Sequence, residues 1–298
     1  MKKSKKTITF ISIFFALFCL GLIIFTKNGS KGLKKDDQKI EIIATNDTYS
    51  EIAKKVAGKH GIAKPVIDNP NIDPHEFKPS NKTATLISKA DLVVCNGLGY
   101  DDWIDPLVGK NKLLNIGSDV AKLKKGANPH LWFDYQLMGK YAEKVAIKLG
   151  EIKPKEKQYF LDNAHQYQNE LKQLDKQVEN LKSTQKESLV DVSEPLFDYA
   201  LSKLNYKINN RNFAEAIEKE TDPSIKDTDA MIDDFKNRRI AFYVQNKQVE
   251  NNTTKMLLKA AKENNIPVLY LTETKPNKIS YIEWQKNIYN DLAKILKK

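Results

Sequence analysis

Two short segments of the chain place a histidine directly after a proline: Asp73-Pro74-His75-Glu76-Phe77 and Asn128-Pro129-His130-Leu131-Trp132. Proline fixes its own φ and biases the residue before it toward extended backbone, so each imidazole follows a stiff stretch of loop. The chain has 4 histidines, and two of them stand in these matched frames. Because imidazole nitrogens are common ligands of transition metals, the pair indicates a metal site.

Two glutamates complete a plausible ligand set. In open α/β sheets, ligands bind beyond the carboxyl ends of the strands. Glu194 comes right after a predicted strand at 189–192, and Glu273 comes right after another at 268–271. Two imidazoles and two carboxylates suit Mn²⁺, Zn²⁺ or Fe²⁺, and the two carboxylates balance the charge of a dication. Each residue also has an ordinary alternative: Glu194 as an acid at a helix N-terminus, Glu273 as a solvated loop acid, and either histidine as a core or loop residue.

Other polar residues near the predicted strand ends fit structural roles better. The segment Asn96–Trp103 has two glycines after a strand but lacks the third glycine of a dinucleotide fingerprint, so it predicts a tight turn with Trp103 packed nearby. His60 and His165 are expected on the surface. Four aspartates fit caps and turns: Asp47, Asp101, Asp102 and Asp134.

The elements that must position these residues alternate between strand and helix. Such alternation predicts an α/β fold with mostly parallel sheets flanked by helices. The first block has predicted strands at 40–44, 65–67, 91–95 and 112–116, and helices at 49–59, 81–89, 102–108 and 135–149. The second has strands at 188–192, 206–208, 240–244 and 267–271, and helices at 195–204, 227–236, 253–263 and 281–296.

A segment without glycine or proline, residues 155–182, separates the two blocks. Its apolar residues recur at helical spacing, and a helix of this length reaches about 40 Å, enough to run along two lobes. A coiled-coil surface is the alternative, but the apolar stripe is short. The predicted organisation is an anchor segment at 1–27, a flexible tether at 28–38, an N-terminal lobe at 39–154, a linking helix at 155–184 and a C-terminal lobe at 185–298.

The N-terminal segment is basic and then apolar. Lysines precede the uncharged run Thr7–Phe25, a pattern that predicts export with the folded part outside the cell. Cys19 lies within the run, but Phe18 before it fits a lipidation signal poorly, so the sequence favours an uncleaved membrane anchor over a lipid on Cys19. Cys95 is then the one cysteine of the exported part, and its apolar neighbours predict a buried structural thiol.

The formal net charge of +11 comes from lysines spread along the 298 residues. Nucleic-acid binding would require a clustered basic stripe with interleaved aromatic residues, which the sequence lacks. A solvated lysine-rich surface is the simple explanation, and attraction to an anionic cell surface is the functional one.

Taken together, five motifs in this order resemble the zinc/manganese-type solute-binding receptors of bacterial ABC importers. The resemblance covers residues 39 to 298 and rests on Asp73–Phe77, Asn96–Trp103, Asn128–Trp132, Ser193–Tyr199 and Thr272–Thr274. It implies two lobes joined by one rather rigid long helix, with one divalent metal ion between the lobes.

The resemblance assigns the metal ligands as His75, His130, Glu194 and Glu273, although the fourth ligand is most often aspartate in the family. Zinc-selective relatives often carry a histidine-rich loop, whereas Ser118–Ala127 is short and has no histidine, which favours Mn²⁺ slightly over Zn²⁺.

The expected function is therefore capture of Mn²⁺ or Zn²⁺ at the extracellular face of the membrane and delivery to an importer permease driven by its ATPase. The chain is expected to be a monomer and not an enzyme. Two alternatives remain open: a metal-dependent hydrolase, although no HExxH-type helix is present, and a surface adhesin with a structural metal.

Overall fold

The computed structural model describes residues 38–70, 72, 77–183, 188–249 and 251–297. The chain divides into two units, Met1–Lys39 and Ile40–Lys298, and every element below belongs to the second unit. The predicted anchor and residues 28–37 of the predicted tether lie outside the described residues. Within the described ranges, no helix has the length and apolar character needed to cross a membrane.

The first sheet has four parallel strands in the order β2-β1-β3-β4. Alternate residues of β3 face opposite sides, so Leu92 and Val94 join one buried cluster while Val93 and Cys95 join another. Both faces are therefore covered by helices, as the sequence predicts. The strands are β1 (Ile40–Asn46), β2 (Gly61–Ile67), β3 (Leu92–Cys95) and β4 (Leu113–Asn115), and the helices are α2 (Asp47–Ala57), α3 (Asn81–Lys89) and α4 (Tyr135–Ile152).

The second sheet repeats this architecture in the order β6-β5-β7-β8, again with parallel pairing. We call the parts around the first and second sheets the first and second lobes. The strands are β5 (Ser188–Val192), β6 (Tyr206–Ile208), β7 (Tyr243–Asn246) and β8 (Val268–Leu271). The helices are α7 (Asp198–Lys203), α8 (Arg211–Glu218), α9 (Ile225–Lys236), α10 (Asn252–Glu263) and α11 (Tyr281–Leu296).

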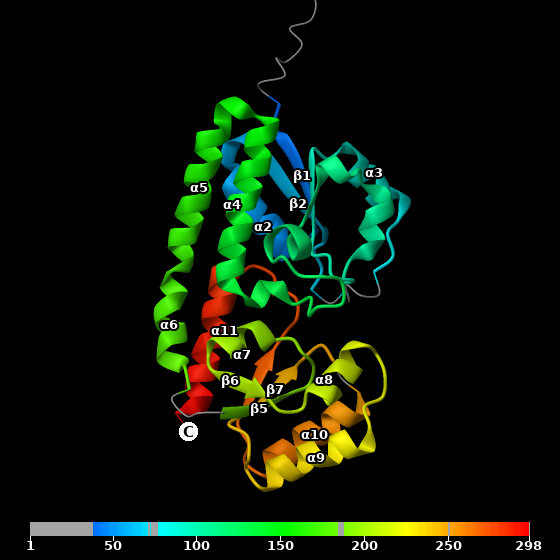
Figure 1. Ribbon diagram of the computed structural model, residues 1–298, viewed down its shortest axis with the longest axis vertical. Coiled ribbons are helices and arrows are strands. Elements are labelled where there is room, and N and C mark those ends of the chain that lie inside the picture. The colour runs from blue at the N-terminus through cyan, green and yellow to red at the C-terminus, as the bar shows by residue number, and fades with distance from the viewer. Residues whose placement is uncertain (1–37, 71, 73–76, 184–187, 250, 298) are drawn as a thin grey trace, which may run out of the picture. The chain divides into compact units, whose positions relative to one another are not determined.

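The segment between the sheets forms two consecutive helices, α5 (Lys157–Leu171) and α6 (Gln173–Leu181). Lys172 between them keeps right-handed helical angles (φ −58°, ψ −20°), so the two run on from one another in Figure 1. α5 packs on α2 and α4 of the first lobe, and α6 packs on α11 of the second. This is the linking helix that the glycine-free segment predicts, divided into two stretches.

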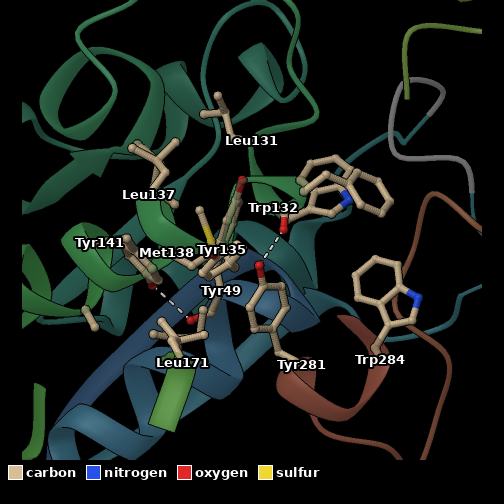
Figure 2. Close-up of a cluster of buried hydrophobic side chains, with 14 of the residues drawn as sticks. Tyr49, Leu131, Trp132, Tyr135, Leu137, Met138, Tyr141, Leu171, Tyr281 and Trp284 are labelled. Carbon is tan, nitrogen blue, oxygen red and sulfur yellow. Dashed lines mark hydrogen bonds between the residues drawn. The ribbon is translucent and has the colours of Figure 1, made fainter. Parts of the chain in front are cut away.

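One buried cluster runs through both lobes. It joins strand residues of β1 and β3 to α4, α5 and α6, and then to β5, β8 and α11. Figure 2 shows Tyr281 at the start of α11 pointing toward Trp132, whose backbone carbonyl accepts a 2.6 Å hydrogen bond from the Tyr281 hydroxyl. At the same helix end, the backbone N–H of Tyr281 donates to the carboxylate of Glu51 in α2, at 3.0 and 3.1 Å. A first-lobe side chain therefore helps to cap a second-lobe helix.

In the second lobe, three sequence expectations differ from the structure. The strand expected at 240–244 lies at Tyr243–Asn246, because pairing with β8 continues through the polar residues Gln245 and Asn246. The helix expected from 195 begins at Asp198, since the preceding residues form a turn in which the Leu196 N–H donates to the Glu194 carbonyl at 2.7 Å. Helix α8 has no counterpart in the expected elements.

Candidate metal centre

A tight turn after β3 carries Tyr100 toward the second lobe. The Asp101 carboxylate accepts 2.7 Å hydrogen bonds from the Thr45 hydroxyl and from the backbone N–H groups of Asn96 and Gly97. Gly97 has φ +75°, where a Cβ would meet the Asn115 side chain, so glycine suits this position. The segment is thus the turn that its sequence predicts, and Asp101 has the structural role expected of it.

Tyr100 contacts one of the predicted ligands. Its hydroxyl donates a 2.6 Å hydrogen bond to Glu273 Oε1, and both residues are buried. Burial and the neighbouring Glu273 carboxylate raise the pKa of Tyr100 well above its usual value, so the hydroxyl keeps its proton at neutral pH. Tyr100 therefore orients one oxygen of the Glu273 carboxylate and leaves it able to bind a cation with the other.

His130 is completely buried, and Asn128 fixes its ring. Asn128 Oδ1 accepts the backbone N–H of His130 at 2.9 Å and lies 2.9 Å from His130 Nδ1. Because a backbone N–H only donates, that Asn128 atom is the oxygen, so Nδ1 carries the proton and Nε2 carries the lone pair. The Asn128 Nδ2 group donates to the Pro195 carbonyl at 2.6 Å, which links the histidine to the segment after Glu194.

The lone-pair side of His130 faces carboxylates of the second lobe. His130 Nε2 lies 3.8 Å from Glu218 Oε2 and 4.0 Å from Glu273 Oε1. The rings of Trp132 and Tyr100 stand edge-on to the imidazole, with centroids 5.4 and 6.4 Å away. These aromatic rings keep bulk water from that side and strengthen electrostatic interactions at Nε2.

The two predicted glutamate ligands line the same cavity of about 360 Å³ in the second lobe. Glu194 is 5% exposed and Glu273 is 8% exposed, and the Asn246 side-chain amide donates to Glu194 Oε1. The described lining residues include no lysine or arginine, so the cavity has a strongly negative potential that favours a cation. Its acids are Glu194, Glu218, Glu220, Asp222 and Glu273.

The predicted ligand set is only partly described. His75 lies outside the described residues, as do Asp73, Pro74 and Glu76 of its motif. His130 and Glu273 approach each other across the lobes, and Glu194 and Glu273 share a cavity. Over the ranges that the structure does describe, no three histidine, cysteine, aspartate or glutamate side chains gather closely enough to hold a metal ion. The set of four remains a prediction.

Sequence reasoning missed three polar residues of this region: Glu218, Asn246 and Gln248. Asn246 ends β7 and Gln248 comes two residues later. Because β7 lies between β5 and β8 in the second sheet, the strand-end rule that selects Glu194 and Glu273 also selects these two residues. Because the sequence predicts this strand at 240–244 and not at 243–246, it does not mark these residues as lying at a strand end. Glu218 ends helix α8, which the sequence did not predict, so no signal placed it near His130.

Comparison with known proteins agrees with the architecture. A family model described as "Zinc-uptake complex component A periplasmic" (ZnuA) matches residues 42–295. The metal ABC transporter substrate-binding lipoprotein SloC of Streptococcus mutans is 29% identical over 203 residues, covering 61% of this chain and 65% of SloC. The manganese-binding lipoprotein MntA of Bacillus subtilis is 22% identical over 248 residues, covering 77% of this chain and 78% of MntA.

Among solved structures, the periplasmic zinc-binding protein TroA of Treponema pallidum superposes with a TM-score of 0.70 at 16% identity. The match covers 87% of this chain and 99% of TroA. At that identity the likeness concerns the fold, and it extends over both lobes. The chain spans slightly less than two thirds of the length of SloC.

Proposed function

The chain belongs to the family of zinc-uptake complex component A (ZnuA), and we propose that it is an extracellular metal-binding receptor of an ABC importer. In this role it captures a divalent transition metal in the cleft between its lobes and delivers it to a membrane permease. The observation that carries the proposal is the buried His130, whose Nε2 faces Glu273 and Glu218 beside an acidic cavity.

The proposed ligands are His75, His130, Glu194 and Glu273. Glu194 and Glu273 come from one lobe and the histidines from the other, so a bound dication neutralises the two carboxylates and draws the lobes together. Glu218 adds a further negative charge within 4 Å of His130, which favours the cation even without a direct bond. Because ligands must lose their protons to bind, acid weakens the complex.

The cargo is Mn²⁺ or Zn²⁺. MntA is named as manganese-binding and TroA as zinc-binding, so the comparisons support both ions. Two carboxylates among four ligands, without a histidine-rich loop, favour Mn²⁺, while the general order of metal affinities favours Zn²⁺. We propose that Mn²⁺ is the ion carried, selected by ligand type and by the supply of free metal and not by raw affinity.

SloC is named as a substrate-binding lipoprotein and MntA as a manganese-binding lipoprotein, and neither name is that of an enzyme, which supports a receptor without a chemical step. A hydrolase would need an open coordination position and a general base beside the metal-bound water, and four protein ligands leave little room for either. No specific observation favours the adhesin alternative. The partners in this proposal are the importer permease and its ATPase, and the receptor acts as a monomer.

The anchor in this proposal is a lipid, contrary to the expectation from the sequence. SloC and MntA are both named lipoproteins, which favours lipidation over the uncleaved helix that the residue before Cys19 suggested. We propose that the lipid is attached to Cys19 and holds the receptor at the extracellular face of the membrane. Mass spectrometry of the N-terminal peptide from native membranes tests this, and an unmodified Cys19 in an intact N-terminus would contradict it.

The decisive experiment is elemental analysis of the protein purified from its native host, with competitive titration of Mn²⁺ and Zn²⁺ on the purified receptor. The wild type should carry one ion per chain, and the His130→Ala and Glu273→Ala variants should each lose at least tenfold in affinity. A matched control is Glu263→Ala, which changes a surface acid at the end of α10. Wild-type protein that binds neither metal would refute the proposal.

A further inference from the structure

The strand β7 ends between the two loops that carry Glu194 and Glu273, since the second sheet has the order β6-β5-β7-β8. Asn246 is the last residue of β7. Its backbone N–H donates to the Ser193 hydroxyl at 2.9 Å, its side-chain amide donates to Glu194 Oε1, and its Oδ1 accepts the backbone N–H of Gln248 at 2.9 Å. Asn246 therefore fixes the backbone of Gln248 relative to the carboxylate of Glu194.

The Gln248 side chain uses both ends of its amide. Its Oε1 accepts the backbone N–H of Glu273 at 2.6 Å and that of Thr274 at 3.3 Å. Its Nε2 donates to the carbonyl of Pro70 at 2.6 Å and to the Thr274 hydroxyl at 2.8 Å. Because backbone N–H groups only donate, the oxygen and nitrogen of this amide are assigned without ambiguity.

Pro70 belongs to the first lobe, in the loop between β2 and α3. The Thr274 hydroxyl also donates to the Pro70 carbonyl, at 2.8 Å. One carbonyl of the first lobe thus receives two hydrogen bonds from the second lobe, and one of the two donors, Gln248, also binds the backbone N–H groups of Glu273 and Thr274. The amide is neutral, so it makes this link without adding charge to a cavity that already contains five acids.

We propose that Gln248 is a positioning residue for the metal site: it couples the position of Glu273 to that of the first-lobe loop at Pro70. This inference rests on the proposed function. Gln248 contacts the backbone of Glu273 and not its carboxylate, so it acts on the cation only through the ligand that it places. Removal of the amide frees the Glu273 backbone and leaves Pro70 with only the Thr274 hydroxyl bond, and a bound cation then leaves more easily.

The test compares three variants of the full receptor. Gln248→Met keeps the length of the side chain and removes every hydrogen bond of the amide, while Thr274→Val removes only the hydroxyl bonds to Pro70 and Gln248. Gln166→Ala, on the exposed face of α5, is the control. The dissociation constant and dissociation rate of Mn²⁺ are measured by competition with a fluorescent chelator and by stopped flow, beside the melting temperature of the metal-free protein.

The Gln248→Met variant should bind Mn²⁺ about 10–100-fold more weakly, as other changes to groups that orient metal ligands do. The loss should lie mostly in a faster dissociation rate, and Thr274→Val should show a smaller loss in the same direction. A purely structural role would lower the metal-free melting temperature and leave the dissociation rate of the folded protein unchanged.

Affinity of Gln248→Met within twofold of wild type would overturn the inference, while Glu273→Ala in the same assay reports separately on the proposed function. If Gln248→Met fails to fold, Thr274→Val decides: a wild-type dissociation rate in that variant would refute the coupling to Pro70. Wild-type receptor that binds no metal would instead refute the proposed function on which the inference rests.

Discussion

Asn128 connects a predicted ligand to the opposite lobe, and its replacement by alanine is the sharpest test of the site. The substitution removes three side-chain hydrogen bonds: two from His130 and one to the Pro195 carbonyl. Each such bond contributes about 1 kcal/mol net, and buried groups that lose their partner cost more. We expect Asn128→Ala to lower the free energy of unfolding of the metal-free protein by about 2–4 kcal/mol.

The effect on metal binding has a separate cause. Asn128→Ala removes the oxygen that accepts the Nδ1 proton of His130, so the ring can instead place the proton on Nε2, where it blocks coordination. Affinity for Mn²⁺ and Zn²⁺ should then fall about 10–100-fold. Isothermal titration measures the affinity, and ¹⁵N chemical shifts of the histidine rings report the change of tautomer directly.

A hydrogen bond from Tyr199 to the backbone of Asn128 provides the control. The Tyr199 hydroxyl donates to the backbone carbonyl of Asn128 at 2.7 Å and does not touch His130. Tyr199→Phe should therefore cost about 1 kcal/mol of stability and leave the tautomer and the affinity unchanged. Equal metal affinity in Asn128→Ala and wild type, or an equal loss in both variants, would refute the role assigned to Asn128.

Four further outcomes are expected. Burial raises the pKa of Asp191 to about 7, so the folded state binds this proton more tightly than the unfolded state, and the free energy of unfolding falls as pH rises from about 4 to 7. In Asp191→Asn, urea unfolding should lose this pH dependence and show a gain of about 2–4 kcal/mol at pH 8. An unchanged pH profile would contradict the raised pKa. Tyr100→Phe should weaken metal binding several-fold by freeing Glu273, and titration with an unchanged dissociation constant would exclude that role. Wild-type affinity should fall from pH 7 to pH 5 because protons compete with the metal, so a flat profile would rule out imidazole and carboxylate ligands. Lys275→Met should lower the free energy of unfolding by about 1–3 kcal/mol in urea, because it removes the buried ammonium that pairs with Asp47 at 2.7 Å and Glu51 at 3.4 Å. An unshifted midpoint would show that these ion pairs contribute nothing.

Elements with a strong local signal could be predicted from the sequence almost to the residue. α3, β5, β6 and α11 lie where their apolar periodicity and flanking polar residues place them. β7 does not, because the apolar run from Ile240 resembles a strand more than Tyr243–Asn246 does, and the polar end of β7 is stabilised by pairing with β8, a contact that sequence periodicity does not encode. α8 is amphipathic, with Phe213 and Ile217 buried on one face, but it has only 8 residues, so its signal is easily missed in the sequence.

The residues of the candidate site likewise divide into those with a local sequence signal and those that depend on tertiary contacts. His130, Glu194 and Glu273 could be selected from the sequence because loop motifs and strand ends mark them. Glu218 could not, because its role depends on a distance between segments that are far apart in the chain. Gln248 stands near a strand end, but its bond to Pro70 in the other lobe could not be predicted. Sequence reasoning therefore finds residues that bear chemical groups at strand ends, while the residues that orient those groups emerge only from the folded geometry.

The capping of α11 by Glu51, together with the buried cluster that runs through both sheets, makes the stability of each lobe depend on the other. A fragment that ends within the linking helix would expose the apolar face of α6 or α11 and leave the first turn of α11 short of an acceptor. Neither half should fold as an independent product. For the same reason, a chimera that takes one half from a relative must also carry over the complementary residues at this seam, such as Glu51 opposite Tyr281.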